Sequence, residues 1–306
     1  MNVVVTGGTG FIGSAAVAEL TARGHAVQVL VRPSSKLGRL HAVTGWHAVI
    51  SDSWNAPEVV EALRAHQPTA FVHCAWQGVG GAERNAAWQI TANLRLTVDA
   101  LELAKKIGCS QWVSLGSQAE YGNLNQRISE DCPTKPTTIY GKSKLIATEV
   151  TQTFCAAEGI KAAILRVFST YGPGDAPAWL IPYIICELKA GRSPKLTACE
   201  QRWDYLYIED AARAIACTVE ARVAGVFNLG SGMARPLRDT VEIIRNEVGG
   251  TISPEFGAVP YRPDQVMWLE ADITRLSQAT GWHPTTSLES GIKKTVAFAL
   301  ANHHQD

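Results

Sequence analysis

The sequence predicts an α/β protein with a doubly wound parallel sheet and a smaller, discontinuous C-terminal lobe. Three observations support this prediction. Short β-branched runs alternate with helical patterns through the first half, a glycine-rich turn directly follows the first run, and Gly and Pro become dense after Leu165. Because crossovers between parallel strands are right-handed, the helices are expected on both faces of the sheet.

The first half divides into strands and helices according to the period of its apolar residues. Runs rich in Val, Ile and Phe predict strands, whereas apolar residues three and four positions apart predict helices. The predicted strands are 2–5, 25–31, 46–50, 70–74 and 111–115, and the predicted helices are 13–23, 57–66 and 86–107.

The second half interrupts this alternation. Glycines and prolines between positions 172 and 182 predict loops, and residues 203–208 are expected to return to the sheet as a buried strand. Beyond Asn228, prolines separate short helices. We therefore expect residues 1–165 and 203–228 to form the sheet domain, and residues 166–202 and 229–306 to form a lobe over the carboxyl edge of the sheet.

Composition excludes several classes of protein. The 306 residues are 46% hydrophobic and carry 28 Lys and Arg against 28 Asp and Glu, so no basic surface for nucleic acid is predicted. No long uncharged apolar run predicts a membrane span, and the N-terminal strand leaves no room for a secretory signal. Seven scattered cysteines without a CxxC pair predict neither disulfides nor a metal site. We expect a cytoplasmic protein.

The segment TGGTGFIG, residues 6–13, lies between the first predicted strand and the first predicted helix. Gly8, Gly10 and Gly13 have the GxGxxG spacing, which lets the backbone approach a pyrophosphate at the N-terminus of a helix. This context predicts a Rossmann dinucleotide-binding domain. The expected cofactor contacts here are Gly7, Gly10, Phe11, Ile12 and Gly13.

The end of the second predicted strand indicates which dinucleotide is bound. An NAD enzyme usually carries Asp or Glu there to bind the ribose 2′-hydroxyl, but here Val31 is followed by Arg32. A guanidinium suits the 2′-phosphate of NADP, so NADPH is expected rather than NAD. The alternative is that Arg32 is only a solvated charge. Asp52 is expected either to accept a hydrogen bond from the adenine amino group or to cap a loop.

Tyr140 and Lys144 are four residues apart at the start of a predicted helix, which places them on one helix face. The lysine ammonium and an oxidised nicotinamide would both favour the phenolate and lower the pKa of Tyr140. Ser117 follows the strand 111–115 and would donate a hydrogen bond to a substrate carbonyl. These three residues predict a proton-transfer site.

With these motifs the chain resembles the extended short-chain dehydrogenase/reductase family, in its nucleotide-sugar branch. The resemblance covers nearly the whole chain and is carried by TGGTGFIG, residues 71–75, Asn93, residues 117–122, YGKSK, and residues 166–174, 203–210, 262–264, 271–272 and 281–284. It implies that Ser117, Tyr140 and Lys144 form a catalytic triad, with Tyr140 and Lys144 also contacting the cofactor. It further implies that Asn93 supports the proton relay or the nearby backbone, that the C-terminal lobe binds a nucleoside-diphosphate sugar, and that the chain forms a homodimer.

Two departures from the family pattern shape the expected reaction. The 4,6-dehydratases of this family carry an Asp-Glu pair where this chain has Gln118 and Ala119, so dehydration is not expected. The 4-epimerases carry an acidic residue at the position of Val31. We therefore expect an NADPH-dependent reductase of a nucleotide-linked 4-keto-6-deoxysugar. The alternatives are an NAD-dependent nucleotide-sugar 4-epimerase and a non-catalytic NADP-binding sensor.

The resemblance also suggests substrate contacts. Ser169 stands where the family has Asn, Arg202 stands one position before the usual Arg, and Arg262 matches a pyrophosphate-binding Arg. A surface ion pair with Asp264 is the alternative for Arg262. Trp179, Trp203 and Trp268 are expected either to stack on the nucleotide base or to pack in the core. His73, on a predicted strand, is expected to be a core residue.

Overall fold

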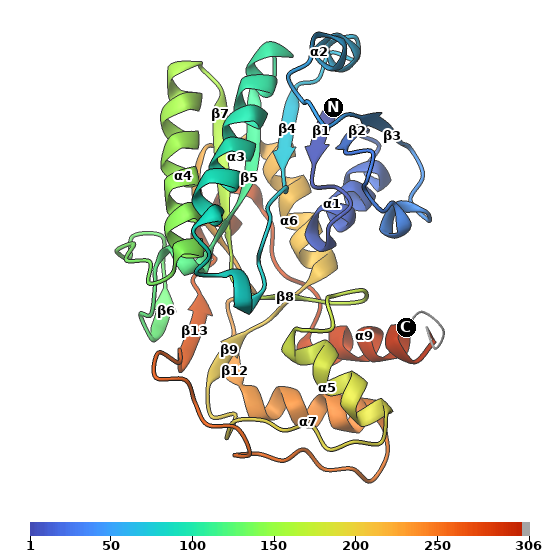
Figure 1. Ribbon diagram of the computed structural model, residues 1–306, viewed down its shortest axis with the longest axis vertical. Helices are drawn as coiled ribbons and strands as arrows, with labels where there is room; N and C mark the ends of the chain where they lie inside the picture. Colours follow the sequence, from blue (N-terminus) through green and yellow to red (C-terminus); the bar gives the residue numbers. More distant parts are fainter. Residues whose placement is uncertain (302–306) are drawn as a thin grey trace.

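A parallel seven-stranded sheet forms one end of the protein in the computed structural model, which describes residues 1–301 apart from the side chain of Ala82 (Figure 1). The strand order is β11-β7-β5-β4-β1-β2-β3, and the chain reverses direction across the sheet between β1 and β4. The strands are β1 (Asn2–Thr6), β2 (Ala26–Val31), β3 (Trp46–Ile50), β4 (Ala70–His73), β5 (Gln111–Ser117), β7 (Lys161–Val167) and β11 (Gly225–Leu229).

Helices cover both faces of this sheet. On one face, α1 (Phe11–Ala22) and α6 (Ile208–Ala221) pack against alternate strand residues such as Val3 and Val5. On the other face, Val4 contacts a cluster that includes α2 (Pro57–Arg64), α3 (Trp88–Lys106) and α4 (Ile139–Ala157). Burial on both faces explains why inner strands such as β1 and β4 read as nearly continuous apolar runs. The expected doubly wound α/β fold is confirmed.

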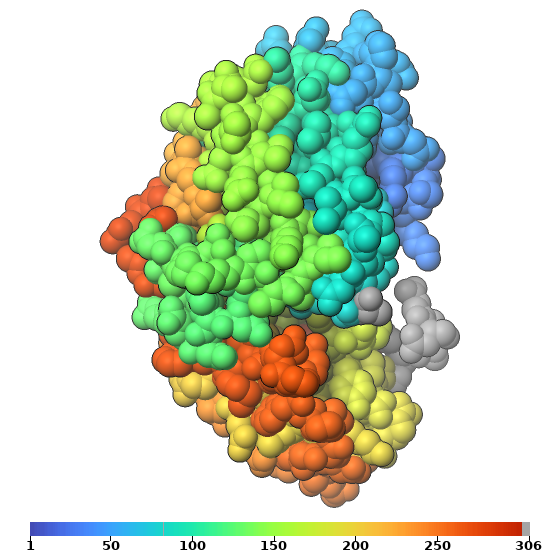
Figure 2. Space-filling view, turned by 60° about the vertical axis from the view of Figure 1, so that its left-hand side comes forward, coloured from blue at the N-terminus to red at the C-terminus, as the bar shows by residue number. Residues whose placement is uncertain are grey.

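The other end of the molecule contains a second, smaller sheet and three packed helices. The four-stranded sheet has the order β12-β9-β13-β6 and is formed by β6 (Gln126–Ile128), β9 (Arg202–Asp204), β12 (Ala234–Pro236) and β13 (Trp268–Ala271). An apolar cluster joins α5 (Leu180–Lys189), α7 (Leu237–Val248) and α9 (Leu288–Ala301). In Figure 2 the yellow and orange parts of this region lie below α3 and α4, which pack side by side.

Short elements complete the described chain. Three turns are 3-10 helical, one pair of two-residue strands is parallel, and one further helix packs beside α6. They are η1 (Gly38–Leu40), η2 (Gly81–Glu83), η3 (Gln118–Glu120), β8 (Thr170–Tyr171), β10 (Leu206–Tyr207) and α8 (Thr274–Thr280).

The expectation that residues 203–208 return to the large sheet is wrong. The edge position beside β7 is taken by β11, while the 203–208 stretch divides between β9, in the four-stranded sheet, and β10, which pairs with β8. Most of its apolar residues pack in the clusters of the second part of the fold, whereas Leu206 packs in the cluster between the large sheet and α6. β6 also pairs in the four-stranded sheet, although residues 126–128 were expected in the sheet domain. The domain boundaries stay a prediction.

A buried carboxylate anchors the four-stranded sheet to the loop after β11. Asp204 accepts hydrogen bonds from the backbone N–H groups of Ser231 (2.7 Å), Gly232 (3.0 Å) and Ala271 (3.0 Å). Burial raises the pKa of Asp204, and these donors oppose the change by stabilising the anion. This carboxylate therefore ties β9 to β13 and to the end of the large sheet.

Three further observations concern membrane spans, metal ions and cysteines in the part of the chain that the structure describes. No helix within residues 1–301 is long and apolar enough to cross a membrane. In the same part of the chain no group of three His, Cys, Asp or Glu residues is placed to hold a metal ion. All seven cysteines are free; three are buried, and Cys186 is exposed.

Candidate active site

A cavity of about 520 Å³ opens at the carboxyl ends of β1 to β4, on the edge where the strand order reverses. Ligands of doubly wound folds bind in this type of crevice. Of the residues expected to bind the cofactor, four line it: Gly7, Gly10, Arg32 and Asp52. The other lining residues are Thr9, Leu30, Ser35, 53–55, 74–77, Arg95, Leu96 and Asp99.

The glycine turn after β1 leaves no room for side chains. Gly7 has a φ of +69°, and a Cβ added to it would lie 2.5 Å from the backbone nitrogen of Ala75. A Cβ on Gly13 would lie 2.1 Å from the carbonyl oxygen of Gly7. Glycine is therefore required at both positions, and the backbone itself forms the wall of the cavity.

The N-terminus of α1 follows this turn and suits an anion. Gly10 is the N-cap, no side chain caps the helix, and no acidic residue lies in its first turn. The first N–H groups of a helix lack partners inside the helix and carry partial positive charge. The backbone of Phe11, Ile12 and Gly13 thus fits a dinucleotide pyrophosphate, although these three residues do not line the cavity.

The opposite part of the cavity includes Arg32, Ser35 and Asp52. The backbone N–H of Arg32 donates to Ser35 Oγ (3.1 Å), and the Arg32 side chain is exposed. No carboxylate takes the place at the end of β2. Arg32 and Ser35 suit either the ribose 2′-hydroxyl of NAD or the 2′-phosphate of NADP.

Ser117, Tyr140 and Lys144 come together where the end of β5 meets the first turns of α4. All three side chains are buried, with exposures of 6 to 7%. The Thr138 hydroxyl caps α4 by accepting the Gly141 N–H (3.0 Å), which fixes the start of this helix. Burial raises the pKa of Tyr140, while a hydrogen bond with Ser117 lowers it. The two hydroxyls are therefore hydrogen-bonded to each other in a buried site.

The Lys144 ammonium contacts the end of β5 and the Trp76 ring. Its Nζ donates to the carbonyl of Leu115 (2.8 Å) and lies 3.6 Å from the centre of the Trp76 ring. Burial lowers the pKa of Lys144 to about 7. We expected Lys144 to supply the charge that lowers the pKa of Tyr140, but the nearby cation that does so in this structure is Arg84.

Trp76, which our sequence reasoning missed, connects the cavity to these catalytic candidates. Its indole lines the cavity, covers Lys144 and meets the Tyr140 ring edge-on, with 6.1 Å between ring centres. The indole nitrogen is buried and has no hydrogen-bond partner among the described residues. The available signal was its position three residues after β4, at the carboxyl edge where ligands of this fold class bind.

Glu120 lies in η3, which directly follows Ser117. Its carboxylate is fully buried and accepts hydrogen bonds from the Ser117 N–H (2.8 Å), Arg166 Nε (2.8 Å) and Thr148 Oγ1 (3.2 Å). The first of these completes a capping box with Ser117. Spacing of the S-x-x-E type was the sequence signal for this contact. Glu120 thus holds the backbone that presents Ser117.

Asn93 supports the cavity wall without lining it. Its amide accepts the Gln77 N–H (2.9 Å) and donates to the Gln77 carbonyl (3.0 Å), and it also donates to the Gln89 side chain (2.7 Å). These contacts match the expected support of the backbone near the proton relay. Direct cofactor binding by Asn93 stays a prediction.

Three of the residues expected to bind substrate, Ser169, Arg202 and Arg262, differ in the contacts that their side chains make. The Ser169 hydroxyl accepts the Trp203 indole N–H (2.9 Å), and Arg202 donates to the carbonyl of Ala234 (2.8 Å). Arg262 is exposed and forms no ion pair with Asp264, although the structure describes both residues. Of the two arginines, Arg202 uses its guanidinium in a backbone contact, whereas the exposed guanidinium of Arg262 has no such contact among the described residues.

The aromatic expectations divide in the same way. Trp179 and Trp268 are about two-fifths exposed, whereas Trp203 packs between two apolar clusters. His73 is buried as expected; its Nδ1 lies 2.8 Å from the Thr6 hydroxyl, and burial lowers its pKa to about 3. His73 is therefore a neutral core residue.

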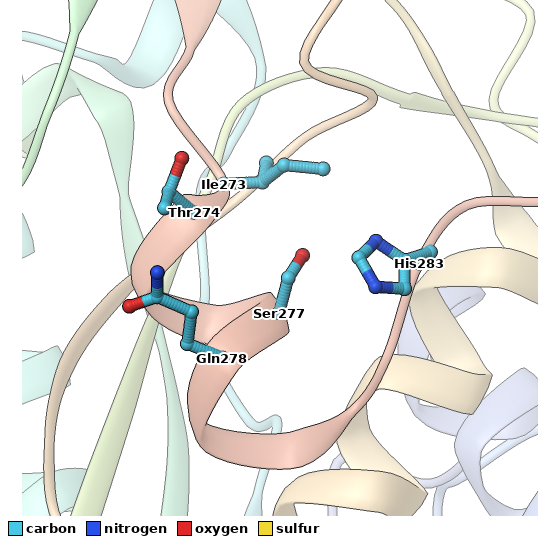
Figure 3. A pocket seen from close by; sticks show the side chains of 5 residues that line it. All are labelled: Ile273, Thr274, Ser277, Gln278 and His283. Atoms are coloured by element: carbon cyan, nitrogen blue, oxygen red, sulfur yellow. The ribbon is translucent and has the colours of Figure 1, made fainter.

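A second, smaller cavity of about 350 Å³ lies beside α8 (Figure 3). Ser277 and His283 face each other across it, with Ile273, Thr274 and Gln278 around them. None of these residues lines the cavity at the sheet edge. It contributes no group to the site described above.

Comparisons with known proteins agree with this geometry. A model of the NAD dependent epimerase/dehydratase family matches residues 3–230. The UDP-glucose 4-epimerase of Corynebacterium glutamicum is 30% identical, with 98% of this chain and 96% of the relative covered. The dTDP-glucose 4,6-dehydratase of Salmonella typhimurium is 26% identical over 99% of this chain and 93% of the relative.

A solved structure shows the same architecture. The Thermus thermophilus UDP-glucose 4-epimerase in complex with NAD has a TM-score of 0.86 and 26% identity, covering 99% of this chain and 100% of the other. Together with the family model, which spans most of the sequence, this similarity establishes the family. The chain belongs to the NAD-dependent epimerase/dehydratase family of nucleotide-sugar enzymes.

Proposed function

We propose that the protein interconverts C4 epimers of a nucleoside-diphosphate sugar, using a bound nicotinamide dinucleotide. The observation that carries the proposal is the pair of buried hydroxyls of Ser117 and Tyr140, joined through Trp76 to a cavity with a glycine cradle. The relatives named as UDP-glucose 4-epimerases, and the NAD in the Thermus thermophilus complex, support this choice over the reductase that we expected from the sequence.

Each residue of the trio has a role in this proposal. A dinucleotide held at Gly7, Gly10 and Arg32 would supply reversible hydride transfer at C4 of the sugar, which allows inversion there. Tyr140 takes the proton from the C4 hydroxyl as the ketone forms and gives it back when the alcohol re-forms. Ser117 donates a hydrogen bond to the same oxygen. Lys144 holds the Trp76 indole, which lines the cavity, against the end of β5.

A second candidate is the NADPH-dependent reduction of a nucleotide-linked 4-keto-6-deoxysugar. One observation favours it: Arg32 lines the cavity at the end of β2, where no carboxylate is present to bind a ribose 2′-hydroxyl. A reductase consumes its cofactor in each turnover, whereas an epimerase regenerates it. Arg262 is the proposed pyrophosphate contact in either reaction, because its guanidinium is exposed.

The deciding experiment incubates the purified protein with UDP-galactose, without added cofactor, and quantifies UDP-glucose. The epimerase proposal predicts conversion and the release of NAD when the protein is denatured. Consumption of NADPH with a nucleotide-linked 4-keto-6-deoxysugar, and no conversion of UDP-galactose, would replace it with the reductase.

Arg32→Ala gives a separate prediction about the cofactor. If Arg32 binds a 2′-phosphate, the variant loses at least about tenfold in NADPH affinity and little in NADH affinity, because a charge-assisted hydrogen bond is removed. Calorimetric titration with both cofactors measures this, and Arg192→Met, at an exposed surface ion pair, is the control. Equal small losses for both cofactors would show that Arg32 is only a solvated charge.

A further inference from the structure

Arg84 is held against the start of α4 by its own backbone. Its carbonyl oxygen accepts the N–H of Tyr140 (2.8 Å), and the side chain of Asn85 accepts the N–H of Ile139 (3.2 Å). Both N–H groups belong to the first turn of α4 and have no acceptor within the helix. The turn that follows η2 therefore caps the helix that carries Tyr140, and it brings Arg84 to that residue.

The Arg84 side chain lies over the catalytic phenol. Its Cζ is 5.2 Å from the centre of the Tyr140 ring, and its Nε is buried without a hydrogen-bond partner in the described chain. Within residues 1–301 no carboxylate forms an ion pair with it. In the described chain the Arg84 guanidinium therefore lies against the Tyr140 ring without a paired carboxylate.

The other charged groups near Tyr140 act differently. Lys144 is directed to Leu115 and Trp76, and its pKa of about 7 leaves it only partly charged at neutral pH. The negative charge of Glu120 raises the pKa of Tyr140, as burial does. The positive charge of Arg84 lowers that pKa, as the hydrogen bond with Ser117 does. Arg84 is therefore the cation that lowers the pKa of Tyr140.

We propose that Arg84 is a positioning residue for Tyr140, whose guanidinium stabilises the phenolate while its carbonyl holds the first turn of α4. The proposal rests on the proposed role of Tyr140 as the proton carrier. During sugar oxidation the C4 hydroxyl proton moves to the phenolate oxygen, and on reduction it returns to the alkoxide. A nearby cation keeps enough phenolate available for the first of these steps.

Titration of tyrosinate by ultraviolet absorption tests this without any substrate. The spectrum of each protein is compared with that of its Tyr140→Phe counterpart, which isolates Tyr140 from the other tyrosines. Arg84→Met removes the charge and keeps aliphatic bulk, whereas Arg84→Lys keeps a charge; the backbone contacts persist in both. At one alkaline pH where circular dichroism shows every protein folded, Arg84→Met is expected to lower the phenolate-to-phenol ratio about tenfold. Arg84→Lys should stay within about threefold of the wild type.

Two controls keep the test decisive. Arg192→Met removes a remote charge that is paired with Glu187, and it should leave the ratio unchanged. Arg84→Gln, measured in parallel, removes the charge but keeps a polar side chain, so a folding defect of the methionine variant does not end the test. An unchanged ratio in the neutral variants, or the same fall with lysine, would overturn the proposal.

The result is independent of the sugar. A fall in the ratio confined to the neutral variants supports the Arg84 proposal even if UDP-galactose is not converted. Conversely, conversion of UDP-galactose with an unchanged ratio keeps the proposed function and removes Arg84 from it. In a protein that turns over, the pKa that governs kcat should move upward in Arg84→Met in step with the titration.

Discussion

At the residue scale, burial shifts the pKa values of Tyr140 and Lys144 in opposite directions. Both side chains are almost inaccessible, and an apolar environment disfavours the charged form of each. The pKa of Tyr140 is therefore raised, and that of Lys144 is lowered to about 7. Near neutral pH the phenol is protonated and the lysine is poised between its two forms.

Lys144→Met should reveal the cost of this buried lysine. Its folded pKa of about 7 lies below the ordinary value of 10.5, so between these pH values the unfolded state binds more protons and wild-type stability rises with pH. Below about pH 7 both states are protonated, and the full cost of burying the charge is present. The stability of Lys144→Met relative to wild type is therefore expected to be greatest near pH 6 and to decline towards about pH 10.

Scanning calorimetry at several pH values measures this difference in unfolding free energy. Lys142→Met, an exposed lysine on the same helix, serves as the control and should show no such trend. A difference between Lys144→Met and wild type that does not change with pH would contradict the buried-lysine account.

Sequence reasoning reached the candidate trio because its signals are local. Tyr140 and Lys144 are one helical turn apart, and Ser117 ends a recognisable strand. Trp76 and Arg84 lie instead in the irregular segment between β4 and α3, which has no period to read. Their contact with α4 depends on how two distant segments pack, so only the structure reveals it.

At the element scale, a tight turn and a helix start place the chemistry. The turn after β1 needs glycine because the backbone near Ala75 is too close for a side chain. The start of α4 packs closely on η3 in the same way, since a Cβ on Gly141 would lie 2.5 Å from the carbonyl oxygen of Ala119. Close backbone approach thus sets both the cofactor cradle and the position of Tyr140.

Gly7→Ala tests the cradle, with Gly24→Ala as its matched control. Both glycines have positive φ, +69° and +79°, but an added Cβ at Gly24 meets nothing within 4 Å. Gly24→Ala is expected to cost about 1 kcal/mol in unfolding free energy from backbone strain alone. Gly7→Ala should cost at least about 1 kcal/mol more because of the contact with Ala75, and it should abolish dinucleotide binding. Equal losses in thermal unfolding, with binding intact in both, would contradict the cradle.

Secondary structure followed the sequence wherever an element has one strong period. The strand 46–50 matches β3, and most other expected boundaries in the first half differ by one or two residues. Residues 203–208 failed because short apolar stretches do not identify their partners. Two such stretches pair with β13 and β8, which lie far apart in sequence, and only tertiary packing decides this.

At the scale of the whole molecule, the cavity lies at the edge where four strands of the large sheet end. A dinucleotide there would contact β1, β2 and β4 together and bind only the folded state. Ligands of this kind raise the unfolding free energy by about 2.7 kcal/mol at a hundred times their Kd. The thermal midpoint is therefore expected to rise steadily with NAD or NADP concentration, as differential scanning fluorimetry measures. A midpoint independent of both would contradict a dinucleotide site.

The fold class was accessible from the sequence because alternation of strands and helices is a property of the whole chain. The second sheet was not, since its four short strands come from segments spread between residues 126 and 271. The expectation of a reductase depended on the end of β2, where Arg32 follows Val31 and the usual carboxylate is missing. The relatives named as UDP-glucose 4-epimerases support the epimerase proposal instead.

The most direct test of the account is the conversion of UDP-galactose by wild type and by Tyr140→Phe. The variant loses only the phenolic oxygen, so dinucleotide affinity and the thermal midpoint should stay close to those of the wild type. Because general acid–base catalysis contributes about 100-fold or more, kcat is expected to fall by at least that factor. A Tyr140→Phe protein with the kcat of the wild type would contradict the assignment of Tyr140 as the proton carrier.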